Sequence, residues 1–363
     1  MAFSFSGVDR LMEDALGKKV FPGAVLLASS RGDIVYHKAF GVSNLCTCEP
    51  VTLETVFDLA SLTKPLATTM SVMAIVDEGR LGLDLSLGQI LPGFENNEKA
   101  GITICQLLLH TAGFPDWQPY YQTLMGYPDH ARKGIVQKLL LSEPLVHAPG
   151  DDTLYSDIGF MVLQWVVEKV SGQSLDQYLS DVVYRGLGIE GLFFNNSLAP
   201  SPGFSDFAAT EICPVRNRLL SGEVHDENAF FMGGVAGHSG LFGTAEAVHR
   251  LITCLAAICK GSEESSVLSR ETVRKFLSCP LGAKRAHGFD IPSGDMPCAG
   301  RFCSPKQTFG HLGFTGTSFW MDLSASISII LLTNRVHPVR TNNRIRKFRP
   351  EIHDAIMLAL GVD

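Results

Sequence analysis

The pattern of hydrophobic and polar positions predicts strands near both ends of the chain, each set accompanied by a helix. Two apolar, β-prone runs at 24–28 and 34–40 flank residues 30–33 (Ser-Arg-Gly-Asp), which have the composition of a hairpin turn. Near the other end, 318–323 and 327–332 flank a second short turn. Apolar residues at helical spacing precede the first pair over 8–16 and follow the second over 352–360, after Pro350. We therefore expect both ends to contribute strands and a covering helix.

The middle of the chain has a different character, because its apolar positions recur mainly at helical spacing. The expected helices lie at 66–78, 104–109, 135–141, 159–170 and 175–183. The pattern predicts an α+β fold in which an antiparallel sheet, completed by both ends and flanked by the terminal helices, carries a mostly helical insertion. We expect residues 1–60 and 200–363 to form an α/β lobe and residues 61–199 a helical lobe, together one domain with the functional cleft between them.

Composition restricts the partners and the compartment. The 363 residues are 45% hydrophobic and carry a formal net charge of −7, so we expect no nucleic-acid partner. A basic run from Arg340 to Arg349 is interpreted as a solvated face without function. The nine cysteines are odd in number and lack a paired zinc spacing, which indicates reduced thiols. With no leader pattern and no long apolar stretch, we expect a cytoplasmic protein without a membrane span.

The chain contains a single Ser-x-x-Lys sequence, formed by Ser61 and Lys64 and followed directly by Pro65. Proline is tolerated in the first helical turn, so Ser61 is predicted at a helix N-terminus with Lys64 one turn along on the same face. The positive end of a helix dipole favours a developing alkoxide, and a desolvated lysine can accept the hydroxyl proton. A capping serine beside a surface lysine would produce the same letters.

Two further segments carry candidate chemistry. Tyr155-Ser156-Asp157 follows a Pro-Gly turn and directly precedes an apolar helical pattern, so Tyr155 is expected to project from a loop. Residues 310–317 read Gly-His-Leu-Gly-Phe-Thr-Gly-Thr and lead into a strand pattern. Glycines at a strand entry allow the backbone of a ligand to approach closely, although a simple bulge would also explain them.

In their order and separations, the three segments resemble the motifs of the serine β-lactamase and penicillin-binding protein family. The resemblance is to the branch with a tyrosine in its second motif, which includes class C β-lactamases, D-amino-acid peptidases and carboxylesterases. It implies that Ser61 is the acylated nucleophile and that Lys64 and Tyr155 share the transfer of its proton. It also implies an oxyanion hole made by the backbone N–H groups of Ser61 and Phe314, with Gly313 next to it.

Two positions depart from that pattern and bear on the substrate. His311 replaces the usual lysine of the third motif, and Asp157 replaces the usual asparagine of the second. A histidine is largely neutral at pH 7, and a carboxylate repels anionic substrates or holds Lys64 protonated. We therefore rank an ester or small amide above a β-lactam as the small-molecule acyl substrate.

A last polar segment contains His225, Asp226 and, further on, His238. Its spacing matches no standard zinc signature, so hydrogen-bonded loop residues are the preferred interpretation and no metal or other cofactor is expected. The segment is similar to one in a subgroup that includes proposed muropeptide amidases, which keeps a cytosolic amidase of cell-wall recycling open. A non-catalytic sensor of an acyl or peptidoglycan ligand is the alternative from a different class.

Overall fold

The computed structural model describes residues 3–195, 205–293, 298–304 and 306–362. Its main sheet is antiparallel with strand order β3-β2-β1-β11-β10-β9, so strands from the two ends of the chain lie side by side at its centre. Ala24 of β1 pairs with Thr333 of β11. The strands span β1 Gly23–Ser30, β2 Asp33–Asn44, β3 Glu49–Pro50, β9 Thr308–Leu312, β10 Ser318–Asp322 and β11 Ile327–Thr333.

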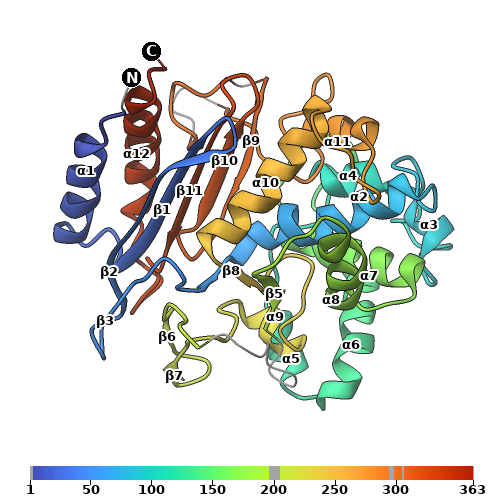
Figure 1. Ribbon diagram of the computed structural model, residues 1–363. Coiled ribbons are helices and arrows are strands. Elements are labelled where there is room, and N and C mark those ends of the chain that lie inside the picture. The colour runs from blue at the N-terminus through green and yellow to red at the C-terminus, as the bar shows by residue number, and fades with distance from the viewer. Residues whose placement is uncertain (1–2, 196–204, 294–297, 305, 363) are drawn as a thin grey trace.

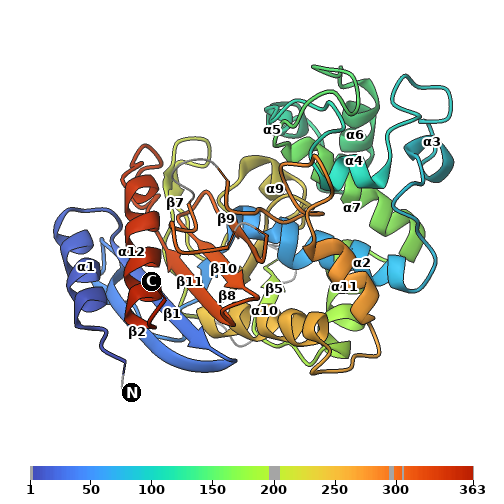
Figure 2. The same ribbon diagram turned by 90° about the horizontal axis from the view of Figure 1, so that it is seen from above.

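Helices cover both faces of this sheet (Figures 1 and 2). The terminal helices α1 (Ser6–Gly17) and α12 (Ile345–Ala359) pack on one face, and α10 (Ala245–Lys260) packs on the other. Side chains that alternate along β1 explain this arrangement: Ala24, Leu26 and Ala28 belong to the core beneath the terminal helices, whereas Val25 and Leu27 join the larger core on the other face. The predicted sheet and covering helices are confirmed.

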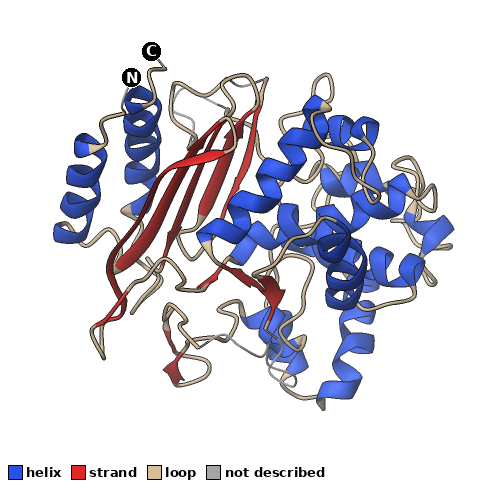
Figure 3. Cartoon of the chain, in the orientation of Figure 1, coloured by secondary structure: helices blue, strands red, loops and turns tan. Residues whose placement is uncertain are grey.

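The predicted helical region lies beyond α10, on the side away from α1 and α12 (Figure 3). A 3₁₀-helix Ala60–Leu62 is followed by a π-helix Lys64–Thr69 that continues into α2. The further helices are α2 Met70–Asp77, α3 Leu87–Ile90, α4 Ile104–Leu108, α5 Tyr120–Leu124, α6 Asp129–Ser142, α7 Asp157–Ser171, α8 Leu175–Tyr178, a second π-helix Leu179–Tyr184, α9 Glu227–Phe231 and α11 Arg270–Leu277. The predicted lobe boundaries near residues 60 and 200 stay a prediction.

Two small sheets complete the described part of the chain. One has the order β4-β8-β5, from Phe57–Asp58, Leu241–Gly243 and Leu192–Phe194. The other pairs β6 Ile212–Cys213 with β7 Arg218–Leu219. The first sheet matters for the site, because it fixes the segment that leads into Ser61 against the segment after His238.

The closing helix begins earlier than its sequence pattern suggests. It starts at Ile345, so Pro350 lies inside it rather than before it. Proline removes one helical hydrogen bond. Burial of Ile345 and Phe348 beneath the sheet supplies apolar packing that offsets this loss.

Candidate active site

Ser61 lies in the 3₁₀-helix, directly after a residue with an unusual backbone. Ala60 has a φ of +47°, a left-handed conformation that costs a non-glycine residue roughly 1–3 kcal/mol. Two buried side chains hold it there: Asp58 Oδ1 accepts the Ala60 N–H at 2.8 Å, and Thr63 Oγ1 donates to the Ala60 carbonyl at 2.6 Å. The main chain therefore turns sharply at Ala60 and presents Ser61 at the start of the helical segment.

Lys64 is fully buried and reaches three partners. Its Nζ lies 3.1 Å from Ser61 Oγ, 2.6 Å from Asp157 Oδ1 and 3.1 Å from the His238 carbonyl oxygen. Burial alone lowers the pKa of Lys64, but the Asp157 carboxylate and Tyr155 more than offset it, and the net pKa is raised. The resting state is therefore an ammonium ion, as the presence of aspartate at position 157 led us to consider.

Tyr155 closes the other side of this group, from the loop before α7. Its side chain interacts with both Ser61 and Lys64, each of which favours its ionised form, and the Lys64 ammonium lies 4.8 Å from the centre of its ring. Its pKa is raised, because burial opposes the phenolate more strongly than the neighbouring Lys64 ammonium favours it. The resting tyrosine is a neutral phenol in contact with the serine hydroxyl.

Two buried histidines pack against Tyr155 and are fixed in opposite tautomers. His311 Nδ1 donates to the Leu312 carbonyl at 2.8 Å, so its Nε2 carries a free lone pair. His110 Nδ1 instead accepts the Ser156 N–H at 2.9 Å. Their rings lie 5.8 Å and 4.6 Å from that of Tyr155, and burial lowers the pKa of each well below its usual range. The third motif thus presents a neutral group, in agreement with the expectation for His311.

Gly313 and Phe314 follow β9 in a tight turn against the segment before Ser61. A Cβ on Gly313 would lie 1.9 Å from Thr317 Oγ1 and 2.7 Å from the Leu59 carbonyl oxygen, which explains the glycine. The Thr317 hydroxyl also donates to that Leu59 oxygen. In the described residues, the backbone N–H groups of Ser61 and Phe314 donate to no protein acceptor. Both donors are therefore available to a ligand.

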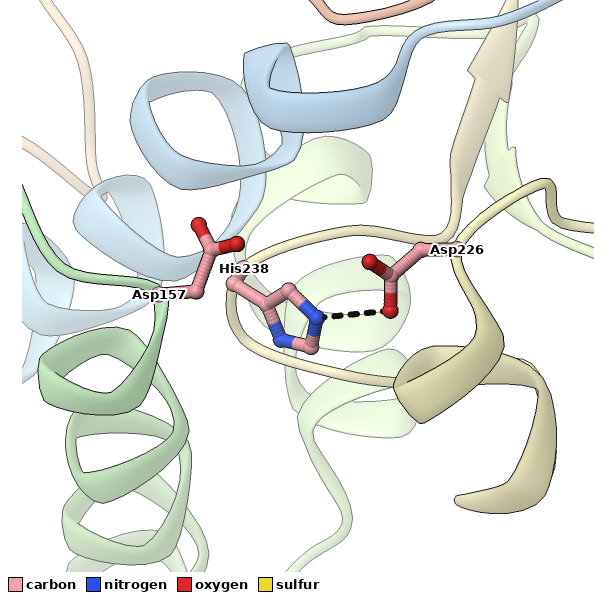
Figure 4. Close-up of side chains that lie close together, drawn as sticks. All are labelled: Asp157, Asp226 and His238. Carbon is pink, nitrogen blue, oxygen red and sulfur yellow. Dashed lines mark hydrogen bonds and ion pairs between the residues drawn. The ribbon is translucent and has the colours of Figure 1, made fainter. Parts of the chain in front are cut away.

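The segment with His225, Asp226 and His238 divides between two places. His238 Nε2 bonds Asp226 Oδ1 at 2.9 Å, and these two side chains lie near Asp157 (Figure 4). His225 instead contacts Glu211 and stacks on the Phe314 ring at 5.6 Å. The ligand atoms of Asp157, Asp226 and His238 lie within 4.8 Å of one another, a spacing that can hold a metal ion. Because Asp157 already pairs with the Lys64 ammonium, its charge is compensated, and the absence of a metal stays a prediction.

Two side chains next to Tyr155, those of His110 and Arg285, are not among the residues that the sequence analysis singles out. The Arg285 guanidinium lies 5.1 Å from the centre of the Tyr155 ring and pairs with Asp290. No spacing rule connects these residues with Ser61, because separate loops bring them together.

A cavity of about 1590 Å³ lies elsewhere, between α1, β2 and residues 337–351. None of the predicted site residues lines it. We therefore assign the candidate active site from the side-chain geometry around Ser61 and not from this cavity.

Comparison with known proteins decides the family. The model of the family described as Beta-lactamase matches residues 8–352. The chain belongs to the beta-lactamase family. Among curated members, a protein named "Putative D-alanyl-D-alanine carboxypeptidase" from Escherichia coli (strain K12) is 34% identical over 349 residues, covering 87% of this chain and 79% of its own length. A protein of the same name from Salmonella typhi is 30% identical over 358 residues, covering 90% and 81%.

Solved structures confirm the fold of this family member. A penicillin-binding protein homologue from Pyrococcus abyssi has a TM-score of 0.75 at 20% identity, over 99% of this chain and 78% of that one. The hydrolase EstCE1 has a TM-score of 0.74 at 23% identity, over 96% and 97%. A class C β-lactamase from Rhodobacter sphaeroides has a TM-score of 0.73 at 16% identity, over 98% and 100%. The predicted family, α+β fold and general class of serine hydrolase are all confirmed.

The sequence analysis also predicts that the protein has no membrane span. Within the described ranges, no helix has both the length and the apolar character needed to cross a bilayer.

Proposed function

We propose that this serine hydrolase forms an acyl-enzyme on Ser61 and hydrolyses a small ester or amide. The observation that carries the proposal is the 3.1 Å contact of Ser61 Oγ with Lys64 Nζ, inside a buried group of compensated charges in which Tyr155 interacts with both residues. A nucleophile is activated by neighbours that can take its proton, and this serine has two such neighbours. A capping serine beside a surface lysine, the plainer interpretation of the motif, is not compatible with a fully buried Lys64.

Proton transfer in this proposal belongs to the Lys64–Tyr155 pair. The resting pair is ammonium and phenol, so the active form has lost one proton, shared between the two groups. In acylation, Ser61 Oγ forms a bond to the acyl carbon while its proton passes to the pair. The leaving alcohol or amine then takes that proton as the bond to the acyl carbon breaks. A water molecule repeats the sequence in reverse and releases the acid.

The proposed oxyanion hole consists of the Ser61 and Phe314 backbone N–H groups. Both are free of protein acceptors in the described residues, and each such donor typically contributes about 10²–10³ in rate. The tight turn at Gly313 and the strained Ala60 hold the two donors in fixed orientations. Donors that need no reorganisation during the reaction stabilise a developing charge most effectively.

Charge at the site supports a neutral acyl substrate over a β-lactam. His311 is neutral where a lysine would attract a carboxylate, and Asp157 adds a negative charge. A muropeptide amide remains the alternative. Trp117 has an exposed ring and follows Asp116, whose carbonyl oxygen accepts the Asp157 N–H. An exposed aromatic ring close to the site can stack on a sugar, which favours the muropeptide alternative. All nine cysteines are free, which supports the cytoplasm as the proposed compartment.

The test is labelling with a fluorophosphonate, followed by intact mass measurement and peptide mapping. A single adduct on Ser61 is expected, and Ser61→Ala should abolish both the adduct and the turnover of chromogenic esters. Ester, amide, muropeptide and β-lactam panels then rank the substrates. A folded wild-type protein that forms no adduct and turns over no substrate would contradict the proposal and support a non-catalytic sensor.

A further inference from the structure

Two buried arginines beside the Gly313 turn have no carboxylate partner in the described part of the chain. Arg335 and Arg349 are each 5% exposed, and neither lies within 4.0 Å of an acidic side chain there. Burial lowers the pKa of each to about 10, so both remain cations at neutral pH. A buried charge without an opposite charge is expensive for a protein to keep. Their position therefore calls for a reason other than stability.

The acceptors of Arg349 are backbone oxygens of the turn. Its Nη2 donates to the Gly313 carbonyl at 3.0 Å and to the Thr317 carbonyl at 2.7 Å, while its Nε has no partner in the described residues. The Gly313 carbonyl and the Phe314 N–H belong to one peptide group. A cation at the carbonyl end withdraws electron density through this conjugated group, because hydrogen bonds in a chain polarise one another.

We propose that Arg349 is a positioning residue of the oxyanion hole, which acts through the Gly313 carbonyl to strengthen the Phe314 N–H as a donor. The inference rests on the proposed function, because it assigns Phe314 N–H to the oxyanion. In this role the guanidinium acts through the Gly313 carbonyl and takes no part in proton transfer. It supplies a permanent positive charge behind the donor, and arginine suits this task because it stays protonated.

Arg335 provides a matched comparison within the same turn. It is equally buried, lies 4.6 Å from the centre of the Phe314 ring and donates to the Phe314 carbonyl through Nε at 2.8 Å. That carbonyl belongs to the next peptide group, which does not contain the Phe314 N–H. Loss of Arg335 removes a buried cation and a clamp on Phe314, but it leaves the polarised peptide intact.

A purely structural role for Arg349 makes a different prediction. Gly313 O also accepts the Gly316 N–H at 3.1 Å, and Gly313 N–H donates to Thr317 O at 2.7 Å, so the turn has hydrogen bonds of its own. If Arg349 only clamped the turn, any variant that folds and keeps the turn would leave the polarity of the oxyanion hole unchanged. The vibrational frequency of the acyl carbonyl on Ser61 measures that polarity directly.

The experiment compares the full-length wild type with Arg349→Met, Arg349→Lys and Arg335→Met. Each is acylated with a slowly hydrolysed ester labelled with ¹³C at the acyl carbonyl. Difference infrared spectra give the carbonyl stretch of the acyl-enzyme, stopped-flow gives the acylation rate, and circular dichroism gives folding and Tm. We expect Arg349→Met to move the carbonyl band to higher frequency and slow acylation by about tenfold, less than the loss of a whole donor.

Arg349→Lys should recover most of the band position, because it restores the charge, and Arg335→Met should shift the band less than Arg349→Met. A folded Arg349→Met whose acyl carbonyl band coincides with that of the wild type would overturn the inference while leaving the proposed function standing. An equal shift in both Met variants would overturn it as well, by removing the specific role of the Gly313 carbonyl. If the wild type itself forms no acyl-enzyme on Ser61, the proposed function fails first.

Discussion

Lys64 and Arg349 are both buried cations that contact the candidate active site, but their charges are balanced in different ways. Lys64 lies 2.6 Å from the Asp157 carboxylate, whereas among the described residues Arg349 donates only to backbone carbonyl oxygens. The first cation can lose a proton and belongs to a coupled group with Tyr155. The second stays charged at all physiological pH values. The difference separates a region that moves protons from a region that supplies a fixed field.

The largest effect should follow removal of the proton-moving cation. Lys64→Met deletes the ammonium that contacts Ser61 and leaves Asp157 without its partner. We expect kcat/KM for a chromogenic ester to fall by about 10²–10⁴, the range for general acid–base groups. Circular dichroism controls for folding. Activity within tenfold of the wild type would transfer proton handling to Tyr155 alone.

Tyr155 and His311 have rings 5.8 Å apart, but we expect unequal losses when each is replaced. Tyr155→Phe removes the hydroxyl that interacts with Ser61, while His311→Ala removes a neutral ring held by the Leu312 carbonyl. We expect Tyr155→Phe to lower kcat by about 10²–10⁴ and His311→Ala to cost far less. Steady-state kinetics on one ester substrate measures both. Equal losses would contradict the division of roles.

Part of the candidate site could be predicted from the sequence motifs alone. The resemblance to a family pattern pointed to a set of residues that the structure places side by side: Ser61, Lys64, Tyr155, Asp157 and His311. Arg349 was interpreted as part of a solvated basic run. Its burial depends on α12 packing across the turn after β9, a tertiary contact that neither periodicity nor charge patterning encodes. The left-handed conformation of Ala60 could not be predicted either, because alanine gives no local signal for that conformation.

The pH dependence of the rate sharpens the comparison further. Burial raises the pKa of Tyr155 and lowers that of Lys64, and the Asp157 carboxylate raises the pKa of both groups, so the active, deprotonated pair forms only as the pH rises. Asp157→Asn removes the negative charge, lowers both pKa values and should move the ascending limb of kcat/KM to lower pH by about 1–3 units. A pH–rate profile of the two proteins measures the shift. An unchanged profile, or a shift to higher pH, would contradict this electrostatic role of Asp157.

The smallest effect concerns the Ser61 N–H, the second proposed oxyanion donor. The carbonyl oxygen of its peptide group accepts a hydrogen bond from an uncharged hydroxyl. Thr63 Oγ1 donates to the Ala60 carbonyl, in the same peptide as the Ser61 N–H, and accepts the Leu241 N–H at 3.0 Å. Thr63→Val keeps the shape but leaves that buried N–H unpaired, so the free energy of unfolding should fall by about 1–3 kcal/mol. Denaturant unfolding measures this loss. The acyl carbonyl band should shift less than in Arg349→Met, because a hydroxyl carries no net charge; a larger shift would reverse the comparison.

The pairing of β1 with β11 has a consequence for how the protein is made. Ala24 finds its partner at Thr333, and the turn with Phe314 and the helix with Arg349 come from the same late part of the chain. Contacts between such distant segments close long loops and form slowly. A nascent chain that has not yet reached β9–β11 leaves β1 with β2 as its one strand neighbour in the main sheet and lacks the proposed oxyanion donor of Phe314. The proposed active site can therefore be completed only after the last strands and the closing helix have been synthesised.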